Sequence, residues 1–344
     1  MSNQNKIDSD KCRLIAFEVI KTLKRRFDNF PIGEDIQKVS SNENLRNAPF
    51  HIKFLQAFEP RIKAKWNDDM PLLLSLTSWL HGLDTTLGQS FFEAVAHILS
   101  GGEKRVFKDY KITVAQAHEI NTIMTDLKNN AIQPNIYCEN CRIRVCNTEC
   151  PKNKIDLGEL TESASQFTAD NFVEKDDIVE AVEIKSVRPN SNEAANEKRK
   201  ILTAKVVLHN LYPNKEIKFW IGFPFDPFYN TEIGCNKTFF MKQLVEFNKY
   251  FDPQEVLLAN ELWDCLSGVT QTMETILEII NAIATPDFEE KFKFINDIHN
   301  YNSMEYIDIL QKWYIIDKRL QWVPKPPIFN KNGDVKKNIF NTKK

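Results

Sequence analysis

Apolar residues follow a helical spacing in the first part of the chain and again in its last part. In the N-terminal part they recur every three or four positions, the repeat of a helix with one buried face, in residues 14–27, 86–99 and 117–130. The same spacing returns after Pro227, in residues 238–251, 255–268 and 273–284. We therefore expect both ends of the chain to be mainly helical.

The central part has the pattern of strands. Short β-rich runs occupy 171–174, 178–187 and 217–223, and one helical stretch, 192–211, separates the last two. The pattern predicts an α/β region between two helical ones. The expected segments are a helical region at 1–130, a cysteine loop at 131–154, an α/β core at 155–235, a helical region at 236–328 and a polar tail at 329–344.

The first two central strands form a predicted hairpin. A two-residue turn at Asp176-Asp177 pairs residues symmetrically about it and sets Asp170 directly opposite Glu183, with about 4.5–5.5 Å between Cβ atoms. Opposed carboxylates repel unless a cation lies between them, and hard oxygen ligands suit Mg²⁺. Lys185 lies on the same face, two residues beyond Glu183. Two carboxylates and an ammonium predict metal-assisted hydrolysis of a phosphodiester.

Composition and charge narrow the possible functions. Lys and Arg number 45 against 47 Asp and Glu, a formal net charge of −2, which excludes a protein that coats nucleic acid through bulk charge. Only ten glycines are present, and none forms the phosphate loop of a P-loop or dinucleotide-binding enzyme. No apolar run reaches the ~20 residues of a membrane span, and the first residues do not resemble a secretory signal. We expect a soluble, cytoplasmic protein.

The charge nevertheless reverses sharply along the central part. Nine acidic residues and one Lys lie between 155 and 183, whereas eight Lys or Arg and three Glu lie between 184 and 218. An acidic metal site beside a phosphate-binding stripe would have this pattern. The residues of the stripe that we expect to contact DNA are Arg188, Asn190, Lys198, Arg199 and Lys200.

Four of the seven cysteines are close together. Cys138, Cys141, Cys146 and Cys150 have the spacing CxxCxxxxCxxxC, which suits one tetrahedral ion wrapped by a short loop. A structural Zn²⁺ is the first interpretation. The alternatives are an iron–sulfur cluster, because Pro151 follows the last cysteine as in ferredoxin runs, and a loop without metal. The loop either only stabilises the fold or also touches DNA.

These residues resemble a known nuclease family. Asp170 and the string VEIK that ends at Lys185 are similar to the PD-(D/E)xK motif, with Ala169-Asp170 in place of the usual Pro-Asp. The longer string VEIKSVRPN resembles the stretch around the catalytic lysine in the TdeIII-like group of type II restriction endonucleases. Three other segments are similar to the same group and follow in its order: 86–99, 223–230 and 261–280.

The resemblance implies an α/β fold with a PD-(D/E)xK restriction-endonuclease-like core, in which helices flank a mixed central sheet. It implies a Mg²⁺-dependent homodimer that makes double-strand cuts in DNA at a short palindrome of the GGNCC class and leaves 5′-phosphates. A cognate DNA methyltransferase would be its genetic partner. Asp170 and Glu183 match the metal ligands and Lys185 the catalytic lysine; the cysteine loop is outside the core motif.

Glu93 is a further candidate. In a helix over 86–99 it lies on a polar face that is almost uncharged, and in many nucleases of this kind a helical glutamate reaches the metal. A glutamate that simply faces solvent fits the pattern equally well. For the whole chain, the alternatives are another PD-(D/E)xK DNA-processing nuclease and a zinc protein that binds DNA without cutting it.

Overall fold

The computed structural model describes most of the chain, in nine ranges. They are 6–30, 53–54, 56–58, 61, 79–134, 158–185, 191–317, 322–337 and 339. Contacts divide the chain into two compact units. We call Ser100–Leu262 the sheet unit, and Met1–Leu99 together with Trp263–Lys344 the helical unit.

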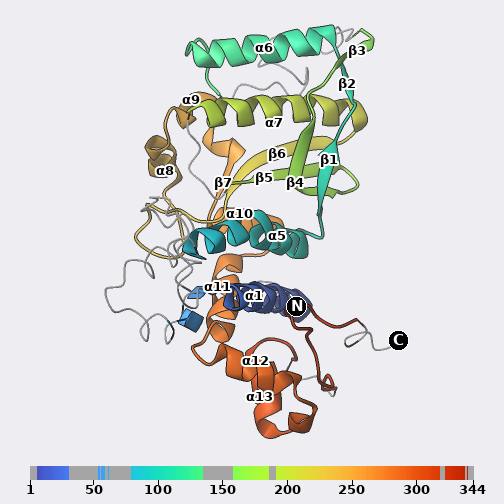
Figure 1. Ribbon diagram of the computed structural model, residues 1–344. Coiled ribbons are helices and arrows are strands. Elements are labelled where there is room, and N and C mark those ends of the chain that lie inside the picture. Colours follow the sequence, from blue (N-terminus) through green and yellow to red (C-terminus); the bar gives the residue numbers. More distant parts are fainter. Residues whose placement is uncertain are drawn as a thin grey trace. The chain divides into compact units, whose positions relative to one another are not determined.

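A mixed five-stranded sheet forms the centre of the sheet unit (Figure 1), in the order β1-β4-β5-β6-β7. The strands are β1 (Glu103–Phe107), β4 (Phe167–Glu174), β5 (Ile178–Ile184), β6 (Glu216–Phe223) and β7 (Val256–Leu258). The pairs β1–β4 and β4–β5 are antiparallel, whereas β5–β6 and β6–β7 are parallel. This confirms the expected α/β fold with a mixed central sheet, which is consistent with a restriction endonuclease.

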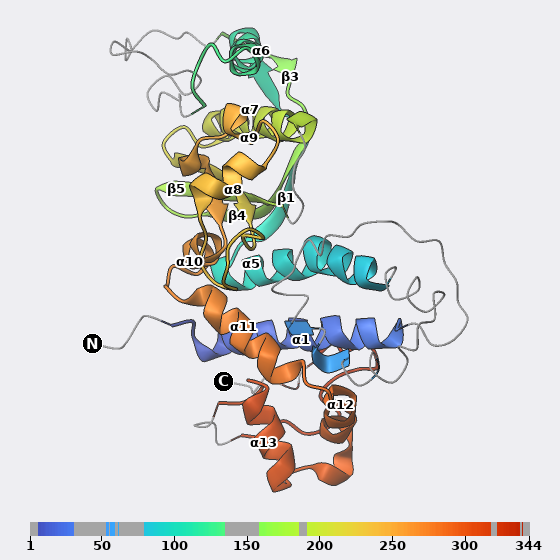
Figure 2. The ribbon, with the colours of Figure 1, turned by 90° about the vertical axis from the view of Figure 1, so that its left-hand side faces the viewer.

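Helices cover one face of this sheet in two layers. The connection between the parallel strands β5 and β6 contains α7 (Ser191–Leu211), as expected, and α7 packs against β6. Figures 1 and 2 show α6 (Val114–Lys128) on the side of α7 that faces away from the sheet. The strands β2 (Lys111–Thr113) and β3 (Leu160–Ser163) form a separate two-stranded ladder. Between β6 and β7 lie α8 (Lys237–Gln243), α9 (Phe247–Tyr250) and η3 (Pro253–Glu255).

The β4–β5 hairpin has the predicted register. Asn171 pairs with Val182 and Glu174 with Val179, and Lys175 N donates to Ile178 O at 2.9 Å across the turn. The ladder ends at the Asn171–Val182 pair, next to Asp170 and Glu183, and beyond it the Asp170 carboxylate accepts a hydrogen bond from Ile184 N.

Three segments differ from the expectation. The region expected to be helical before residue 130 contributes β1 to the sheet. The expected helix over 255–268 begins as strand β7 and continues as α10 (Asn260–Ser267) only after Ala259, whose φ is +52°. The expected helix over 238–251 is divided into α8 and α9 around Glu246, whose φ is +54°. A left-handed residue cannot continue a right-handed helix, and a three-residue strand is too short to show an alternation.

The helical unit is built around α1 (Ser9–Asp28), which packs against α11 (Thr272–Ile283). Residues 79–86 are helical and continue through a π-helical turn, η2 (Leu87–Phe91), into α5 (Phe92–Ser100). The other elements are η1 (Gln56–Phe58), α12 (Phe288–Asn296), η4 (Ile298–Asn300) and α13 (Met304–Lys312).

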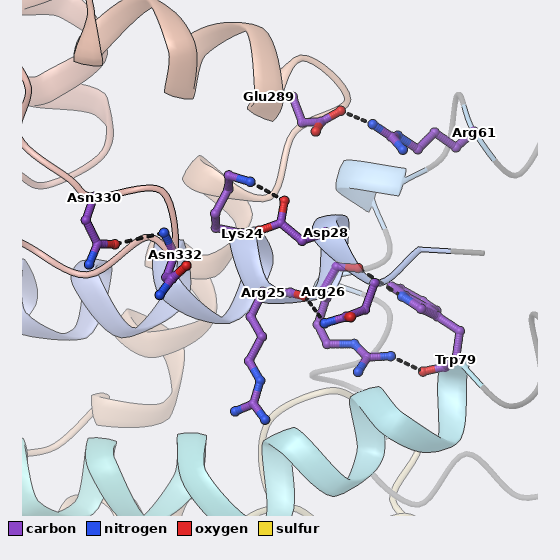
Figure 3. A network of polar contacts seen from close by, with 10 residues as sticks. Lys24, Arg25, Arg26, Asp28, Arg61, Trp79, Glu289, Asn330 and Asn332 are labelled. Carbon is purple, nitrogen blue, oxygen red and sulfur yellow. Dashed lines mark hydrogen bonds and ion pairs between the residues drawn. The ribbon is translucent and has the colours of Figure 1, made fainter. Parts of the chain in front are cut away.

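Polar contacts join these parts of the helical unit (Figure 3). Arg26 donates to Trp79 O at 2.6 Å, and Trp79 Nε1 donates back to Arg26 O at 3.0 Å. Arg61 forms an ion pair with Glu289. Within the described part of the chain, no helix has the length and apolar character needed to cross a membrane.

Candidate active site

Asp170 lies at an irregularity of the sheet. Glu103 pairs with Phe172 but Arg105 pairs with Ala169, so β4 carries one extra residue there, a β-bulge, and Asp170 and Asn171 together face Lys104. Bulges redirect side chains and are common beside active sites. The Asp170 carboxylate is buried, accepts a hydrogen bond from Ile184 N at 2.9 Å and lies 3.4 Å from Lys104 Nζ.

Glu183 is buried near the end of β5 and contacts two lysines. Its Oε1 lies 3.0 Å from Lys185 Nζ, and its Oε2 lies 2.6 Å from Lys200 Nζ. The geometry at Oε2 does not meet that of a hydrogen bond. Helix α7 thus adds Lys200 beside Glu183, and the hairpin places the three motif residues Asp170, Glu183 and Lys185 at one end of the β4–β5 pair. This is the arrangement that the sequence predicted; their chemical roles stay predictions.

Lys185 lies between two carboxylates. Its Nζ is 3.0 Å from Glu183 and 2.8 Å from Oε1 of Glu197, which comes from α7. Burial alone would lower the pKa of Lys185, but the carboxylates outweigh this effect and hold the pKa above its usual value. The ammonium therefore remains charged at neutral pH in this arrangement.

The sequence did not single out Lys104 or Glu197. Lys104 lies on β1, a strand that was not expected, so nothing placed it beside Asp170. Glu197 had a weak signal, because it lies three residues before Lys200 on the same face of a predicted helix. We call the six residues together the site cluster: Lys104, Asp170, Glu183, Lys185, Glu197 and Lys200.

The site cluster fits a magnesium ion in the chemistry of its donors. Among the described residues no group of three or more His, Cys, Asp or Glu side chains is arranged to hold a metal. Mg²⁺ does not require one, because it is commonly bound by one or two carboxylates together with water and substrate phosphate. Asp170 and Glu183 supply two such carboxylates, and Glu183 Oε2 is a buried oxygen without a hydrogen bond. In this arrangement lysine ammonium groups neutralise both carboxylates.

The residues expected to contact DNA have different environments. Lys198 is fully buried and pairs with Glu255 at 2.6 Å, which corrects its assignment to a DNA-facing surface, since a buried, paired ammonium cannot reach a phosphate. Arg199 is exposed and donates to Asn121 Oδ1 at 2.7 Å, and Lys200 belongs to the site cluster. Arg188 and Asn190 lie outside the described residues.

Two further candidates are not tested by this geometry. Glu93 is in the first turn of α5 and belongs to the helical unit, whereas the site cluster belongs to the sheet unit. The cysteines of the expected metal loop, Cys138, Cys141, Cys146 and Cys150, lie outside the described residues. The roles of all five residues stay predictions.

Known proteins define the class of this chain. Residues 8–284 match the family described as "Type II restriction endonuclease, HinfI". The type II restriction enzyme MjaII of Methanocaldococcus jannaschii is 45% identical over an alignment of 317 residues, which covers 87% of this chain and 81% of MjaII. No solved structure matches the chain.

The chain is accordingly a type II restriction enzyme, a site-specific deoxyribonuclease. Within that class it belongs to the HinfI family. The expected resemblance is thereby confirmed at the level of type II restriction endonucleases, but the family that matches is HinfI and not the TdeIII-like group named from the motifs.

Proposed function

We propose that the enzyme cuts both strands of duplex DNA with Mg²⁺ at the site cluster, through attack of water on the scissile phosphodiester. The observation that supports this proposal is the β4–β5 hairpin: its ladder ends beside Asp170 and Glu183, the Asp170 carboxylate accepts from Ile184 N, and Glu183 lies 3.0 Å from Lys185 Nζ. Two opposed, buried carboxylates would repel each other, so a site that gathers them requires compensating positive charge.

Each residue has a role that follows from its position. Asp170 and Glu183 would hold Mg²⁺, whose chemistry is to polarise the phosphoryl oxygen and to activate a water nucleophile. Asp170 is oriented by the backbone N–H of Ile184. Lys185 donates hydrogen bonds to the attacking water or the phosphate and neutralises the charge that develops there. The leaving group is the 3′-oxygen, so the products carry 5′-phosphates.

The finer specificity rests on the motif resemblance alone. We propose a short palindromic site of the GGNCC class, with a cognate methyltransferase that protects the same site in the cell. A palindrome is matched by a two-fold symmetric protein, so the active form would be a homodimer. Glu93 is proposed as an additional metal ligand.

The cysteine loop is proposed to bind one structural Zn²⁺. The support is the ligand spacing, because four thiolates within thirteen residues suit one tetrahedral ion. Elemental analysis of the purified protein should find about one zinc per chain. If the protein is brown and contains iron, the loop binds an iron–sulfur cluster and not zinc. Protein that contains neither metal would refute both assignments.

A digest of unmethylated closed-circular plasmid tests the nuclease proposal. With Mg²⁺ we expect a fixed set of discrete fragments, and with Ca²⁺ we expect DNA binding with little cutting, because Ca²⁺ is larger and less exacting in geometry. Progressive loss of DNA would indicate an exonuclease. Binding without cleavage in Mg²⁺ would contradict the proposed chemistry.

A further inference from the structure

Glu197 is a half-buried carboxylate that shares two lysines with Glu183. Its Oε1 lies 2.8 Å from Lys185 Nζ, and its Oε2 lies 3.8 Å from Lys200 Nζ. Glu183 contacts the same two ammonium groups at 3.0 and 2.6 Å. The side chain of Glu197 is only 14% exposed, and its Oε2 is buried without a hydrogen bond. Two carboxylates therefore share one pair of lysines.

The charges of the site cluster balance without a metal. Three carboxylates (Asp170, Glu183 and Glu197) face three ammonium groups (Lys104, Lys185 and Lys200). A divalent ion that binds Glu183 must take this carboxylate from the lysines. Their half-buried ammonium groups then need another anion nearby, because a charge that is partly removed from water is costly to leave unpaired. Glu197 is already in contact with both.

The fold keeps Glu197 in this position. Glu197 and Lys200 lie three residues apart on one face of α7, where side chains at this spacing are neighbours. The adjacent Lys198 is buried and paired with Glu255, which fixes the rotation of the helix about its axis. Glu197 is thus presented to the end of β5 by a helix that cannot easily turn.

Resting on the proposed function, we propose that Glu197 is a positioning residue. It retains the ammonium groups of Lys185 and Lys200 beside the scissile phosphate when Glu183 binds the metal. Without the Glu197 charge, the lysines either stay on Glu183 and compete with the ion or move away from the phosphate. The residue acts through the lysines and does not itself touch the ion or the DNA.

The test is the Glu197→Gln variant, which preserves the shape of the side chain and removes its charge. We expect kcat for plasmid cleavage in Mg²⁺ to fall about 10- to 100-fold, the usual effect of removing a group that orients a site residue, with KM little changed. The control is Glu216→Gln. Glu216 forms an exposed ion pair with Lys218 at 3.2 Å, and it lies at the start of β6, whereas the end of β6 pairs with Ile184 beside the site cluster. Equal cleavage by the two variants would overturn the proposal.

A second readout separates positioning from other roles. In Ca²⁺, affinity for a labelled duplex that the wild-type enzyme cuts should be unchanged or tighter in Glu197→Gln, because a negative charge has been removed. Weakened Ca²⁺-dependent binding would instead make Glu197 a metal ligand, and a large fall in melting temperature would make it a structural residue. Either result contradicts the inference.

Coupling to Lys200 completes the test. If Glu197 acts through the lysines, the loss in the double variant Glu197→Gln, Lys200→Gln is smaller than the product of the two single losses. Losses that simply multiply would contradict this mechanism. Full activity in Asp170→Asn would refute the proposed function itself. If Glu197→Gln retains wild-type activity while Asp170→Asn is inactive, only the role of Glu197 is refuted.

Discussion

Lys198 and Glu255 form an ion pair in the interior of the sheet unit. Lys198 Nζ lies 2.6 Å from Glu255 Oε2, and Lys205 lies 3.5 Å from the other oxygen. Burial lowers the pKa of Lys198 to about 8, against the opposing effect of Glu255. Burial alone would raise the pKa of Glu255, but the two lysines outweigh it and hold this pKa below its usual value. At acidic pH Lys198 stays charged, so the lowered pKa of Glu255 determines how the stability of the protein depends on pH.

Replacing Glu255 should destabilise the protein strongly. Glu255→Gln leaves the buried Lys198 ammonium without its counter-ion, which costs about 3–5 kcal/mol. We expect a correspondingly lower free energy of unfolding in urea at pH 7. The control is Glu246→Gln, which removes an exposed carboxylate 3.5 Å from Lys249 and should change little. Equal effects of the two changes would contradict the account.

Glu255→Gln should also change how the free energy of unfolding depends on pH below neutrality. The pKa of Glu255 is lower in the folded than in the unfolded protein, where it is near 4.5, so the unfolded state binds more protons between the two values. The stabilisation is fully present above about pH 4.5 and is lost as the pH falls through the folded pKa. In Glu255→Gln this loss should be absent, and urea unfolding at several acidic pH values measures it. An unchanged acid slope would argue against a native ion pair.

The candidate site shows which residues a sequence can predict. Asp170, Glu183 and Lys185 were predictable because a two-residue turn fixes the register of a hairpin and strand alternation fixes the face. Lys198 was misplaced, because a run of basic residues on a helix does not reveal which one faces the interior. Glu197 needed the observed position of α7 beside β5, which depends on tertiary packing.

At the scale of elements, the bulge on β4 is fixed by contacts at the start of β1. Ser100 Oγ donates to Asn171 Oδ1 at 2.8 Å and accepts from Gly102 N at 3.0 Å. Asn171 is buried and directly follows Asp170. These contacts tie the entry of β1 to the bulge that presents Asp170 to Lys104.

Removing the Ser100 hydroxyl should weaken this junction. Ser100→Ala leaves the side-chain oxygen of Asn171 and the N–H of Gly102 without this partner, which costs about 1–3 kcal/mol for a buried group. We expect a lower melting temperature and slower cleavage. Ser163→Ala, on the exposed strand β3, is the matched control and should stay within about 0.5 kcal/mol of wild type. An unchanged melting temperature and cleavage rate in Ser100→Ala would show that the bulge does not depend on this contact.

Elements with strong local patterns were predicted well, and those that depend on partners were not. The hairpin β4–β5 and helix α7 follow from alternation, turn residues and helical spacing. β1 and β7 are short edge strands of the sheet, and each is defined by pairing with one neighbour, β4 or β6. An apolar run such as that of β7 looks like the start of the helix that follows it.

For the whole molecule, attraction to DNA must be local. The formal net charge is −2, so the overall charge does not draw the protein to a polyanion. Of the basic residues expected to contact DNA that the structure describes, Lys200 lies in the site cluster, where the scissile phosphate would bind.

A salt series of DNA binding should detect this local contact. In Ca²⁺, Lys200→Gln should reduce the slope of log affinity against log salt by about one unit, as expected for one lost phosphate contact. Lys336→Gln, at an exposed position near the C-terminus, is the control and should leave the slope unchanged. If only the Lys336 variant alters the slope, the DNA-facing surface lies elsewhere.

The most direct test of the account is cleavage by variants of the three motif residues. Asp170→Asn, Glu183→Gln and Lys185→Met should each reduce plasmid cleavage in Mg²⁺ by at least about 10²- to 10⁴-fold, the range for removal of groups that act in the transition state. Folding, monitored by thermal unfolding, should be retained. Near wild-type cleavage by a folded Asp170→Asn or Glu183→Gln variant would contradict the assignment of the site.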